Sequence, residues 1–325
     1  MCATVLVTGG TGNIGSFVVS RLLDAGHDVV SYDLTNRVEN LQRLDVADEV
    51  ELRQGDVTDE YALLRALRET GSTHVVHLAT YKTANELRTS VTSAEVNPRK
   101  AMQVNVVGSN NVFEAARVLD DQIERVVWAS STGVYGPPDA YDEWVTEDDV
   151  LLPETHYGAT KQYVEQQSES YVEHFDQEIV AIRPHNVFGP NMETPQWIAT
   201  LFRKAATEQP VTIPYAGDET LSICYVEDVA QAFVKATFAP NERLSHRAYN
   251  VRGELLTVSD AVDTLRRILP ESNVTVPQEG SFEWSHRLDV TAAREELGYE
   301  REYDFERGAR EFVDTIRRER GMQPL

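Results

Sequence analysis

A tyrosine and a lysine four positions apart, Tyr157 and Lys161, form the first pattern in this sequence that could carry out chemistry. On a helix this spacing puts both side chains on one face, so both can point into the same cleft. A tyrosine with its ordinary pKa of about 10 is a poor base at neutral pH, but a nearby cation favours the phenolate. Tyr157 is therefore expected to be a base and Lys161 to supply the charge. The alternative is a surface tyrosine and lysine on an amphipathic helix.

A serine-rich turn, from Ser130 to Gly136, follows a predicted buried strand. Ligands of parallel sheets bind at the carboxyl ends of the strands, so this turn is expected to lie in a site. The turn and the helix of Tyr157 together weaken the interpretation of Tyr157 as a plain surface residue.

Three evenly spaced glycines, Gly9, Gly12 and Gly15, follow the first predicted strand and open the first predicted helix. Gly9 permits a tight turn, Gly12 lets the backbone approach a pyrophosphate, and Gly15 lets the helix pack closely on the strand. The helix N-terminus, with Asn13 and Ile14, attracts the anion. The loop predicts a dinucleotide site, and the alternative is a plain turn.

An acidic residue, Asp33, ends the second predicted strand. Its carboxylate can accept hydrogen bonds from ribose hydroxyls and would repel a 2′-phosphate, so NAD is favoured over NADP. The nearby Arg37 leaves NADP open. Asp56, after the third predicted strand, could receive the adenine amino group. The alternative for Asp33 is a helix or turn cap, and the alternative for Asp56 is the N-cap of the next helix.

The elements that must position these residues alternate along the first half of the chain. Short β-branched runs alternate with longer amphipathic stretches, a pattern typical of βαβ units in a parallel sheet. The predicted strands are 4–8, 28–32, 50–54, 74–78, 125–130 and 178–183, and the predicted helices are 13–25, 60–69, about 99–119 and 157–174. The sequence thus predicts an α/β fold, a doubly wound parallel Rossmann sheet with a smaller C-terminal substrate-binding lobe.

The predicted domain boundary lies where prolines become frequent, with five between 184 and 214. Residues 1–183 are predicted to form the dinucleotide-binding domain. A strand and helix within 220–250 are expected to return to its sheet. The substrate-binding lobe is then made of 184–219 and 251–325.

The charge balance excludes several classes of partner. The chain of 325 residues has 30 Lys+Arg and 53 Asp+Glu, a net charge of −23, so it lacks the basic face that nucleic acid requires. No apolar run is long enough to cross a membrane and no signal peptide opens the chain, which predicts a cytoplasmic protein. High acidity with few lysines suggests a halophilic protein, against the alternative of an ordinary acidic cytosolic one.

Neither cysteines nor histidines form a metal-binding pattern. Cys2 and Cys224 are too few for a disulfide framework and have no ligand companions at metal-binding spacing. The histidines His74, His77 and His156 also lack such companions, so no metal is expected.

The motifs together resemble those of the extended short-chain dehydrogenases, the family of sugar-nucleotide epimerases, dehydratases and related sugar dehydrogenases. The resemblance covers nearly the whole chain. Its motifs lie at 8–15, 55–57, 77–79, 105–108, 130–136, 157–161, 183–190, 225–229 and 287–299.

The resemblance implies a role for each matching residue. Ser131 would bond the reacting hydroxyl, Tyr157 would remove its proton while a hydride passes to the nicotinamide, and Lys161 would tune the tyrosine and hold a ribose hydroxyl. Further cofactor contacts are implied for Val57, Leu78, Ala79, Thr80, Asn105, Pro184 and His185. Further substrate contacts are implied for Lys82, Thr132 and Asn186.

Two departures from the family pattern bear on the reaction. Dehydratases of the family have an acid pair where this chain has Thr132 and Gly133, so water elimination is not expected. Nucleotide-sugar enzymes have an arginine for the diphosphate where this chain has Leu221, and a second expected arginine is missing from 274–285. Arg203, Arg252 or Arg287 could replace them.

These departures favour an NAD-dependent dehydrogenase that oxidises a hydroxyl of a free sugar or sugar acid. The alternative is an NAD-dependent nucleotide-sugar epimerase similar to UDP-glucose 4-epimerase, and a third hypothesis is a non-catalytic dinucleotide sensor. The long helices near 99–119 and 157–174 resemble those through which relatives form homodimers, and simple packing on the sheet is the alternative.

Overall fold

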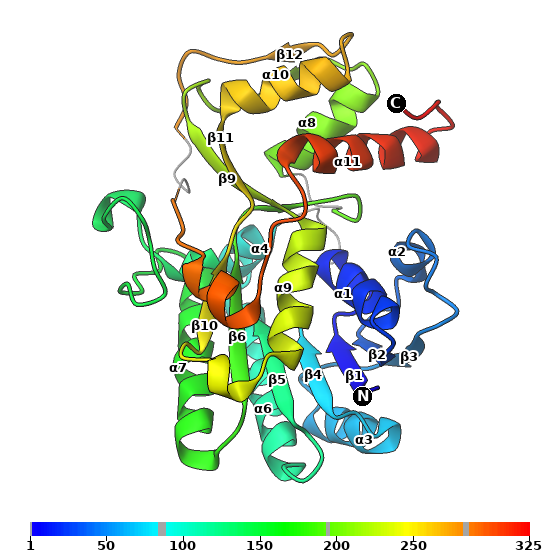
Figure 1. Cartoon of the computed structure of the whole chain (residues 1–325), viewed down its shortest axis with the longest axis vertical. Helices are drawn as coiled ribbons and strands as arrows, with labels where there is room; N and C mark the ends of the chain where they lie inside the picture. Colours follow the sequence, from blue (N-terminus) through cyan, green and yellow to red (C-terminus); the bar gives the residue numbers. More distant parts are fainter. Residues whose placement is uncertain (1, 84–88, 193–195, 282–285) are drawn as a thin grey trace.

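The computed structural model describes residues 2–83, 89–192, 196–281 and 286–325, and its main sheet has seven strands in the order β10-β6-β5-β4-β1-β2-β3 (Figure 1). The strands are β1 Thr4–Thr8, β2 Asp28–Asp33, β3 Glu51–Gln54, β4 His74–His77, β5 Arg125–Ala129, β6 Ile179–Pro184 and β10 Ala248–Val251. Every neighbouring pair is parallel. The predicted α/β fold class is confirmed.

Helices cover both faces of this sheet because its strands are apolar on both sides. Val5 and Val7 of β1 pack with α1 Asn13–Asp24 and α9 Val226–Phe238 on one face. Leu6, between them, packs on the other face with three helices. These are α3 Glu60–Thr70, α6 Gly108–Val118 and α7 His156–Phe175.

Shorter helical pieces join these elements. The predicted helix near 99–119 is divided into α5 Pro98–Ala101, the π-helical turn η1 Met102–Val107 and α6. The remaining pieces are α2 Val38–Gln42, α4 Ser90–Val96, η2 Thr132–Val134, η3 Pro138–Ala140, η4 Asn241–Arg243 and η5 Ala293–Leu297. In the part of the chain that the structure describes, no helix is both long and apolar enough to span a bilayer.

A smaller lobe lies beyond the carboxyl ends of the main strands (Figure 1). Its three-stranded sheet has the order β11-β9-β7. The lobe contains β7 Val187–Phe188, β8 Val211–Thr212, β9 Thr220–Tyr225, β11 Glu254–Thr257, β12 Val274–Thr275, α8 Trp197–Ala206, α10 Val258–Ile268 and α11 Phe305–Glu319. Of the segment 220–250, β9 pairs within the small sheet, whereas α9 packs on the main sheet and β10 joins it. Residues 193–195 and 282–285 of the predicted lobe lie outside the described residues.

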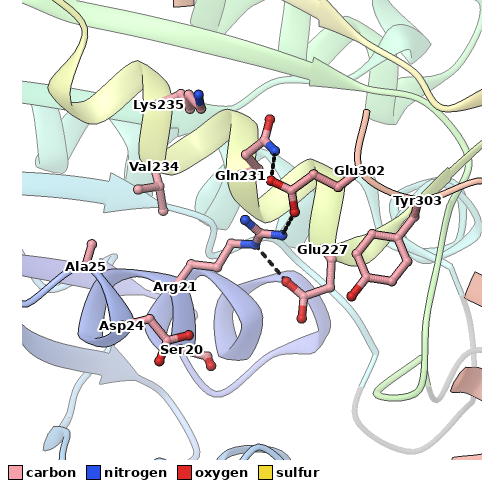
Figure 2. A pocket seen from close by; sticks show the side chains of 10 residues that line it. All are labelled: Ser20, Arg21, Asp24, Ala25, Glu227, Gln231, Val234, Lys235, Glu302 and Tyr303. Carbon is pink, nitrogen blue, oxygen red and sulfur yellow. Dashed lines mark hydrogen bonds and ion pairs between the residues drawn. The ribbon is translucent and has the colours of Figure 1, made fainter. Parts of the chain in front are cut away.

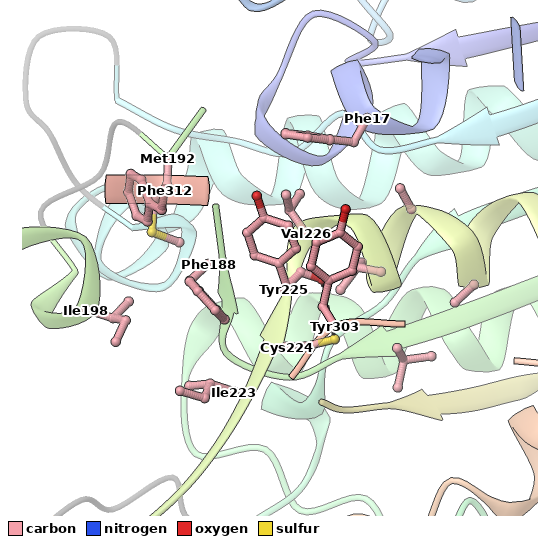
Figure 3. Packing of buried hydrophobic residues seen from close by; sticks show 14 of the residues in the cluster. Phe17, Phe188, Met192, Ile198, Ile223, Cys224, Tyr225, Val226, Tyr303 and Phe312 are labelled. Carbon is pink, nitrogen blue, oxygen red and sulfur yellow. Dashed lines mark hydrogen bonds between the residues drawn. The ribbon is translucent and has the colours of Figure 1, made fainter. Parts of the chain in front are cut away.

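One apolar cluster joins the lobe to the main domain (Figure 3). The ring of Phe188 lies 5.3 Å from that of Tyr225 and 5.8 Å from that of Phe202, measured between centroids. Phe17 of α1 and Val226 of α9 belong to the same cluster. The lobe is therefore packed against the helices that cover the dinucleotide-binding sheet.

Candidate active site

The glycine turn brings the start of α1 close to the end of β1. Gly9 has a φ of +71°, which favours glycine, and a Cβ at Gly15 would lie 2.0 Å from the Gly9 oxygen. Gly12, the N-cap of α1, has no side chain that could bond the first amides of the helix, so these amides face outward. Asn13 Oδ1 is buried without a hydrogen-bond partner among the described residues, and Ile14 packs on the core. This cradle fits a pyrophosphate.

The two predicted nucleoside-binding aspartates have different surroundings. Asp33 Oδ2 accepts hydrogen bonds from Thr11 Oγ1 at 2.7 Å and Thr11 N at 3.3 Å, which tie it to the glycine turn. A carboxylate has acceptor capacity for ribose hydroxyls beyond these. Asp56 Oδ1 accepts a bond from Thr58 N at 2.8 Å, whereas the N-cap of α3 is Asp59. Asp56 is therefore a turn cap and not the helix cap.

A buried histidine links the glycine turn to the end of β4. His77 Nδ1 lies 2.6 Å from Thr8 Oγ1, and its Nε2 lies 3.0 Å from Ser109 Oγ. Burial lowers the pKa of His77 to about 3, so the ring is neutral. The backbone amides of Leu78 and Ala79 donate to the same Thr8 hydroxyl. The network holds Leu78 and Ala79 beside the turn, as a cofactor-lining position requires.

The side chain of Asn105, in the π-helical turn, forms hydrogen bonds with neighbouring residues of the protein. Its Oδ1 accepts bonds from Tyr81 N at 2.8 Å and Thr80 Oγ1 at 3.1 Å, and its Nδ2 donates to Thr160 Oγ1 at 3.2 Å. Asn105 therefore fixes Thr80 against α7. Lys82 is exposed on the same loop. In contrast, Val57 is a buried core side chain.

The three predicted catalytic side chains lie together at the carboxyl end of β5. Tyr157, in the first turn of α7, shares a side-chain hydrogen bond with Ser131. Lys161 Nζ lies 5.6 Å from the centre of the Tyr157 ring and donates to Ala129 O at 2.6 Å. Thr155 caps α7 by accepting a bond from Gly158 N, which sets the direction of this first turn. The structure thus brings Ser131, Tyr157 and Lys161 together, and their catalytic roles stay predictions.

Burial is the largest influence on both titratable groups. It raises the pKa of Tyr157 to about 12, and the hydrogen bond of Ser131 opposes this rise. It lowers the pKa of Lys161 to about 8, and the negative charge of Glu165 opposes this fall. The raised pKa keeps Tyr157 protonated near neutral pH, and a cation beside it, such as an oxidised nicotinamide ring, would favour the phenolate.

The segment after β6 carries the remaining predicted contacts. Pro184 ends the strand, and the His185 amide donates to Val251 O at 3.0 Å. His185 Nδ1 lies 2.7 Å from Thr132 Oγ1, and its Nε2 lies 3.1 Å from Asn186 Nδ2. Asn186 has a φ of +36°, a left-handed conformation that is often found at functional sites.

Neither of two surface cavities contains the catalytic group. The larger, of about 500 Å³, lies between α1 and α9, where Arg21 forms ion pairs of 2.7 Å with both Glu227 and Glu302 (Figure 2). The smaller, of about 320 Å³, lies beside His286. Tyr157 lines neither, so the site is identified from its side chains and not from cavity size. No set of three metal-ligating side chains occurs within the described ranges.

Sequence reasoning missed a buried ion pair behind the site. Glu165 follows Lys161 by one helical turn and pairs with Arg183 of β6. The sequence does show an acid, Glu165, on the same helical face as Lys161. It does not show the partner of this acid, because Arg183 lies on another element.

Fold and site together indicate a dinucleotide-binding enzyme in which a serine, a tyrosine and a lysine lie side by side at the end of β5. The model of the NAD dependent epimerase/dehydratase family matches residues 5–251, and the chain belongs to this family. The predicted family, the enzyme class and NAD as the cofactor are confirmed at this level.

Three relatives illustrate the similarity. UDP-glucose 4-epimerase of Mycolicibacterium smegmatis is 31% identical, over 96% of this chain and 98% of the relative. UDP-glucuronate 4-epimerase 1 of Arabidopsis thaliana is 27% identical, over 95% of this chain and 76% of the relative. The solved structure of UDP-glucose 4-epimerase from Thermus thermophilus in complex with NAD is 28% identical, with a TM-score of 0.78 over 97% of this chain and 99% of that one.

Proposed function

We propose that this chain is an NAD-dependent nucleotide-sugar 4-epimerase. The supporting observation is the end-to-end similarity to UDP-glucose 4-epimerase in a chain whose Ser131, Tyr157 and Lys161 lie together. The sequence alone favoured a dehydrogenase of a free sugar. The relatives favour its alternative, because those described above act on UDP-sugars.

The proposed chemistry begins with proton transfer. Tyr157, as the phenolate, accepts the proton of the sugar C4 hydroxyl, while the Ser131 hydroxyl donates to the same sugar oxygen. NAD supplies a reversible hydride acceptor when bound. Lys161 holds the positive charge that favours the phenolate. With the opposite face of the sugar ketone presented, C4 would take the hydride back and its oxygen would take the proton back from Tyr157, so no net oxidation would occur.

Dehydration is not supported by the same residues. Protonating a leaving hydroxyl requires an acid near Tyr157. The Thr132 hydroxyl is bonded to His185, and a Cβ at Gly133 would stand 3.6 Å from Tyr157 Cδ1, where this chain has no side chain.

One observation favours a second candidate, the dehydrogenase of a free sugar or sugar acid. Leu221 is fully buried in the core and supplies no charge to a diphosphate. Arg203 donates to Met192 O, and Arg287 pairs with Glu143 at 2.9 Å.

Arg252 is the remaining arginine of the three, and it too donates to backbone oxygens, from Nη1 to Gly253 O at 2.8 Å among them. It directly follows β10, whose Val251 accepts the bond from His185. Its Nε donates to Leu288 O at 2.8 Å, and its guanidinium lies 5.4 Å from the centre of the Trp144 ring. In the epimerase proposal the diphosphate is placed near Arg252, because this arginine directly follows Val251, which bonds His185.

The experiment incubates the purified protein with NAD and with UDP-glucose, UDP-glucuronate, free aldoses or uronic acids. Formation of the C4 epimer without NADH accumulation supports the epimerase. Accumulation of NADH with a free sugar supports the second candidate, and NAD binding without turnover of any sugar supports the sensor hypothesis.

Tyr157→Phe is the matched test of the base. We expect turnover to fall by about 10²-fold or more, because the phenol oxygen is lost, while NAD affinity changes little. Tyr163→Phe, an exposed tyrosine of the same helix, is the control and should leave both unchanged. Loss of NAD binding in Tyr157→Phe would mean that the residue has a different role.

A homodimer remains part of the proposal. Large apolar side chains are exposed on η1, α6 and α7, the two stretches predicted to pair. They are Met102, Val107, Val118, Tyr163 and Phe175.

Adaptation to concentrated salt and a cytoplasmic location also stay predictions. The physical basis of the salt prediction is that dissolved ions shield the repulsion within a chain of net charge −23.

A further inference from the structure

The ion pair of Glu165 and Arg183 is almost fully enclosed. Arg183 Nε and Nη2 donate to Glu165 Oε1 and Oε2 at 2.9 and 2.7 Å, and both side chains are 5% exposed. Such bidentate geometry orients a carboxylate firmly. A buried ion pair is weak support for stability, since a well-packed apolar pair often serves as well. A role other than stabilising the fold is therefore expected for the Glu165–Arg183 pair.

The pair contacts both elements that supply catalytic side chains. Glu165 lies one turn after Lys161 on α7 and also accepts a hydrogen bond from the Ser130 hydroxyl. Ser130 stands between Ala129, whose oxygen accepts the bond from Lys161 Nζ, and Ser131, which bonds Tyr157. One carboxylate thus connects the lysine to the strand end that presents the serine.

We propose that Glu165, oriented by Arg183, is a positioning residue that keeps Lys161 protonated and, through Ser130, fixes the strand end that presents Ser131 to Tyr157. Its consequence for turnover rests on the proposed function. Its effect on the charge of Lys161 does not depend on the substrate.

The groups around Lys161 leave Glu165 with a defined electrostatic role. The charged and titratable groups around the lysine are Tyr157 and Glu165 on α7 and His77 on β4. Arg183 on β6 stands behind them, paired with Glu165. His77 and Tyr157 are neutral near pH 7, because burial shifts both pKa values in that direction. Among these groups Glu165 is the anion, and it opposes the effect of burial on the lysine.

The test measures the protonation of Lys161 directly by NMR of the full chain carrying lysines labelled with ¹³C at Cε. The chain has five lysines, so the spectrum is simple, and the Lys161 signal is the one lost in Lys161→Arg. We expect its titration midpoint near pH 8 in the wild type. Glu165→Gln should lower this midpoint by about one pH unit, because the attracting charge is gone.

A second variant guards against misfolding. Glu165→Gln leaves Arg183 buried without its partner, whereas the double variant Glu165→Gln/Arg183→Met removes both charges. The double variant should show a smaller lowering of the midpoint, because the Arg183 cation, which opposes protonation of Lys161, is removed together with the anion. Glu165→Asp keeps the charge and should restore it in part. Glu169→Gln, an exposed acid one turn further along α7, is the control and should not move it.

Turnover supplies the second readout. If Lys161 loses its proton one unit earlier, the ratio of variant to wild-type kcat should fall about tenfold between pH 6 and pH 9, whatever uniform loss accompanies it. A structural role alone would lower kcat by the same factor at every pH. An unchanged Lys161 midpoint in folded Glu165→Gln would overturn the proposal. If no sugar is turned over, the epimerase proposal fails, yet the NMR midpoint still decides this one.

Discussion

A methyl group added at Gly12 and one added at Gly15 separate the two functions of the glycine turn. At Gly15 the new Cβ would lie 2.0 Å from Gly9 O and 2.8 Å from Gly10 Cα, and both are backbone atoms that cannot rotate away. At Gly12 the nearest atom is Gly9 O at 3.1 Å, and the φ of −77° is ordinary for alanine. The methyl group at Gly15 collides with the backbone of the turn, whereas the methyl group at Gly12 mainly fills space in front of the helix.

The expected magnitudes follow from these distances. Gly15→Ala forces α1 away from the turn and should cost about 1–3 kcal/mol of unfolding free energy, the usual range for overpacking. Gly12→Ala should cost less than about 1 kcal/mol, because its neighbour need move by only a few tenths of an ångström. Its methyl, however, stands where a pyrophosphate would approach the helix N-terminus, so NAD affinity should fall about tenfold or more, which is ~1.4 kcal/mol.

Urea unfolding without NAD and calorimetric titration with NAD measure the two effects separately. Gly12→Ala should bind NAD weakly yet unfold almost like the wild type, whereas Gly15→Ala should be impaired in both assays. Wild-type NAD affinity in Gly12→Ala would refute the assignment of the turn as the pyrophosphate site. A wild-type unfolding free energy in Gly15→Ala would refute the close packing of α1 on the turn.

Three further predictions concern stability and assembly. Burial raises the pKa of Asp228 to about 6, so on acidification the folded state takes up a proton before the unfolded state does. As the pH falls from about 7 to about 4.5, the wild type should therefore become more stable relative to Asp228→Asn by about 2 kcal/mol. Urea unfolding of both proteins at each pH measures this difference. Val107→Glu should convert a dimer to a folded monomer in analytical ultracentrifugation, and a wild-type monomer would contradict the proposed pairing. Added KCl should raise the thermal midpoint, because it shields the net charge of −23; a midpoint highest in dilute buffer would speak against salt adaptation.

The main sheet could be predicted because each of its strands can be recognised from a few consecutive residues of the sequence. With the exception of β3, the strands β1 to β6 are short runs that contain β-branched residues, and each of the six lies within one or two residues of its predicted range. The small sheet escaped prediction because β7 has only the two residues Val187–Phe188, too few to show a period. The π-helical turn at Met102–Val107 also has no proline or glycine inside it to mark the break.

The site was predictable where spacing along one element determines it. Tyr157 and Lys161 share a helix, so their proximity follows from helical geometry. The partner of Glu165 could not be predicted, because Arg183 comes from a strand that approaches only through tertiary packing. The contacts of Asn105 with Thr80 depend likewise on how two distant segments meet.

The chain leaves the main sheet after β6, builds part of the small lobe and then returns to place α9 on one face and β10 beside β6. A protein shortened to residues 1–183 would consequently keep α1 but lose α9 from that face, and it would expose β6 as an unpaired edge, which favours aggregation. Transplanting the lobe from a relative would require several separated segments to be exchanged at once. Engineering a new sugar preference is accordingly better attempted by single replacements between the lobes than by swapping a contiguous module.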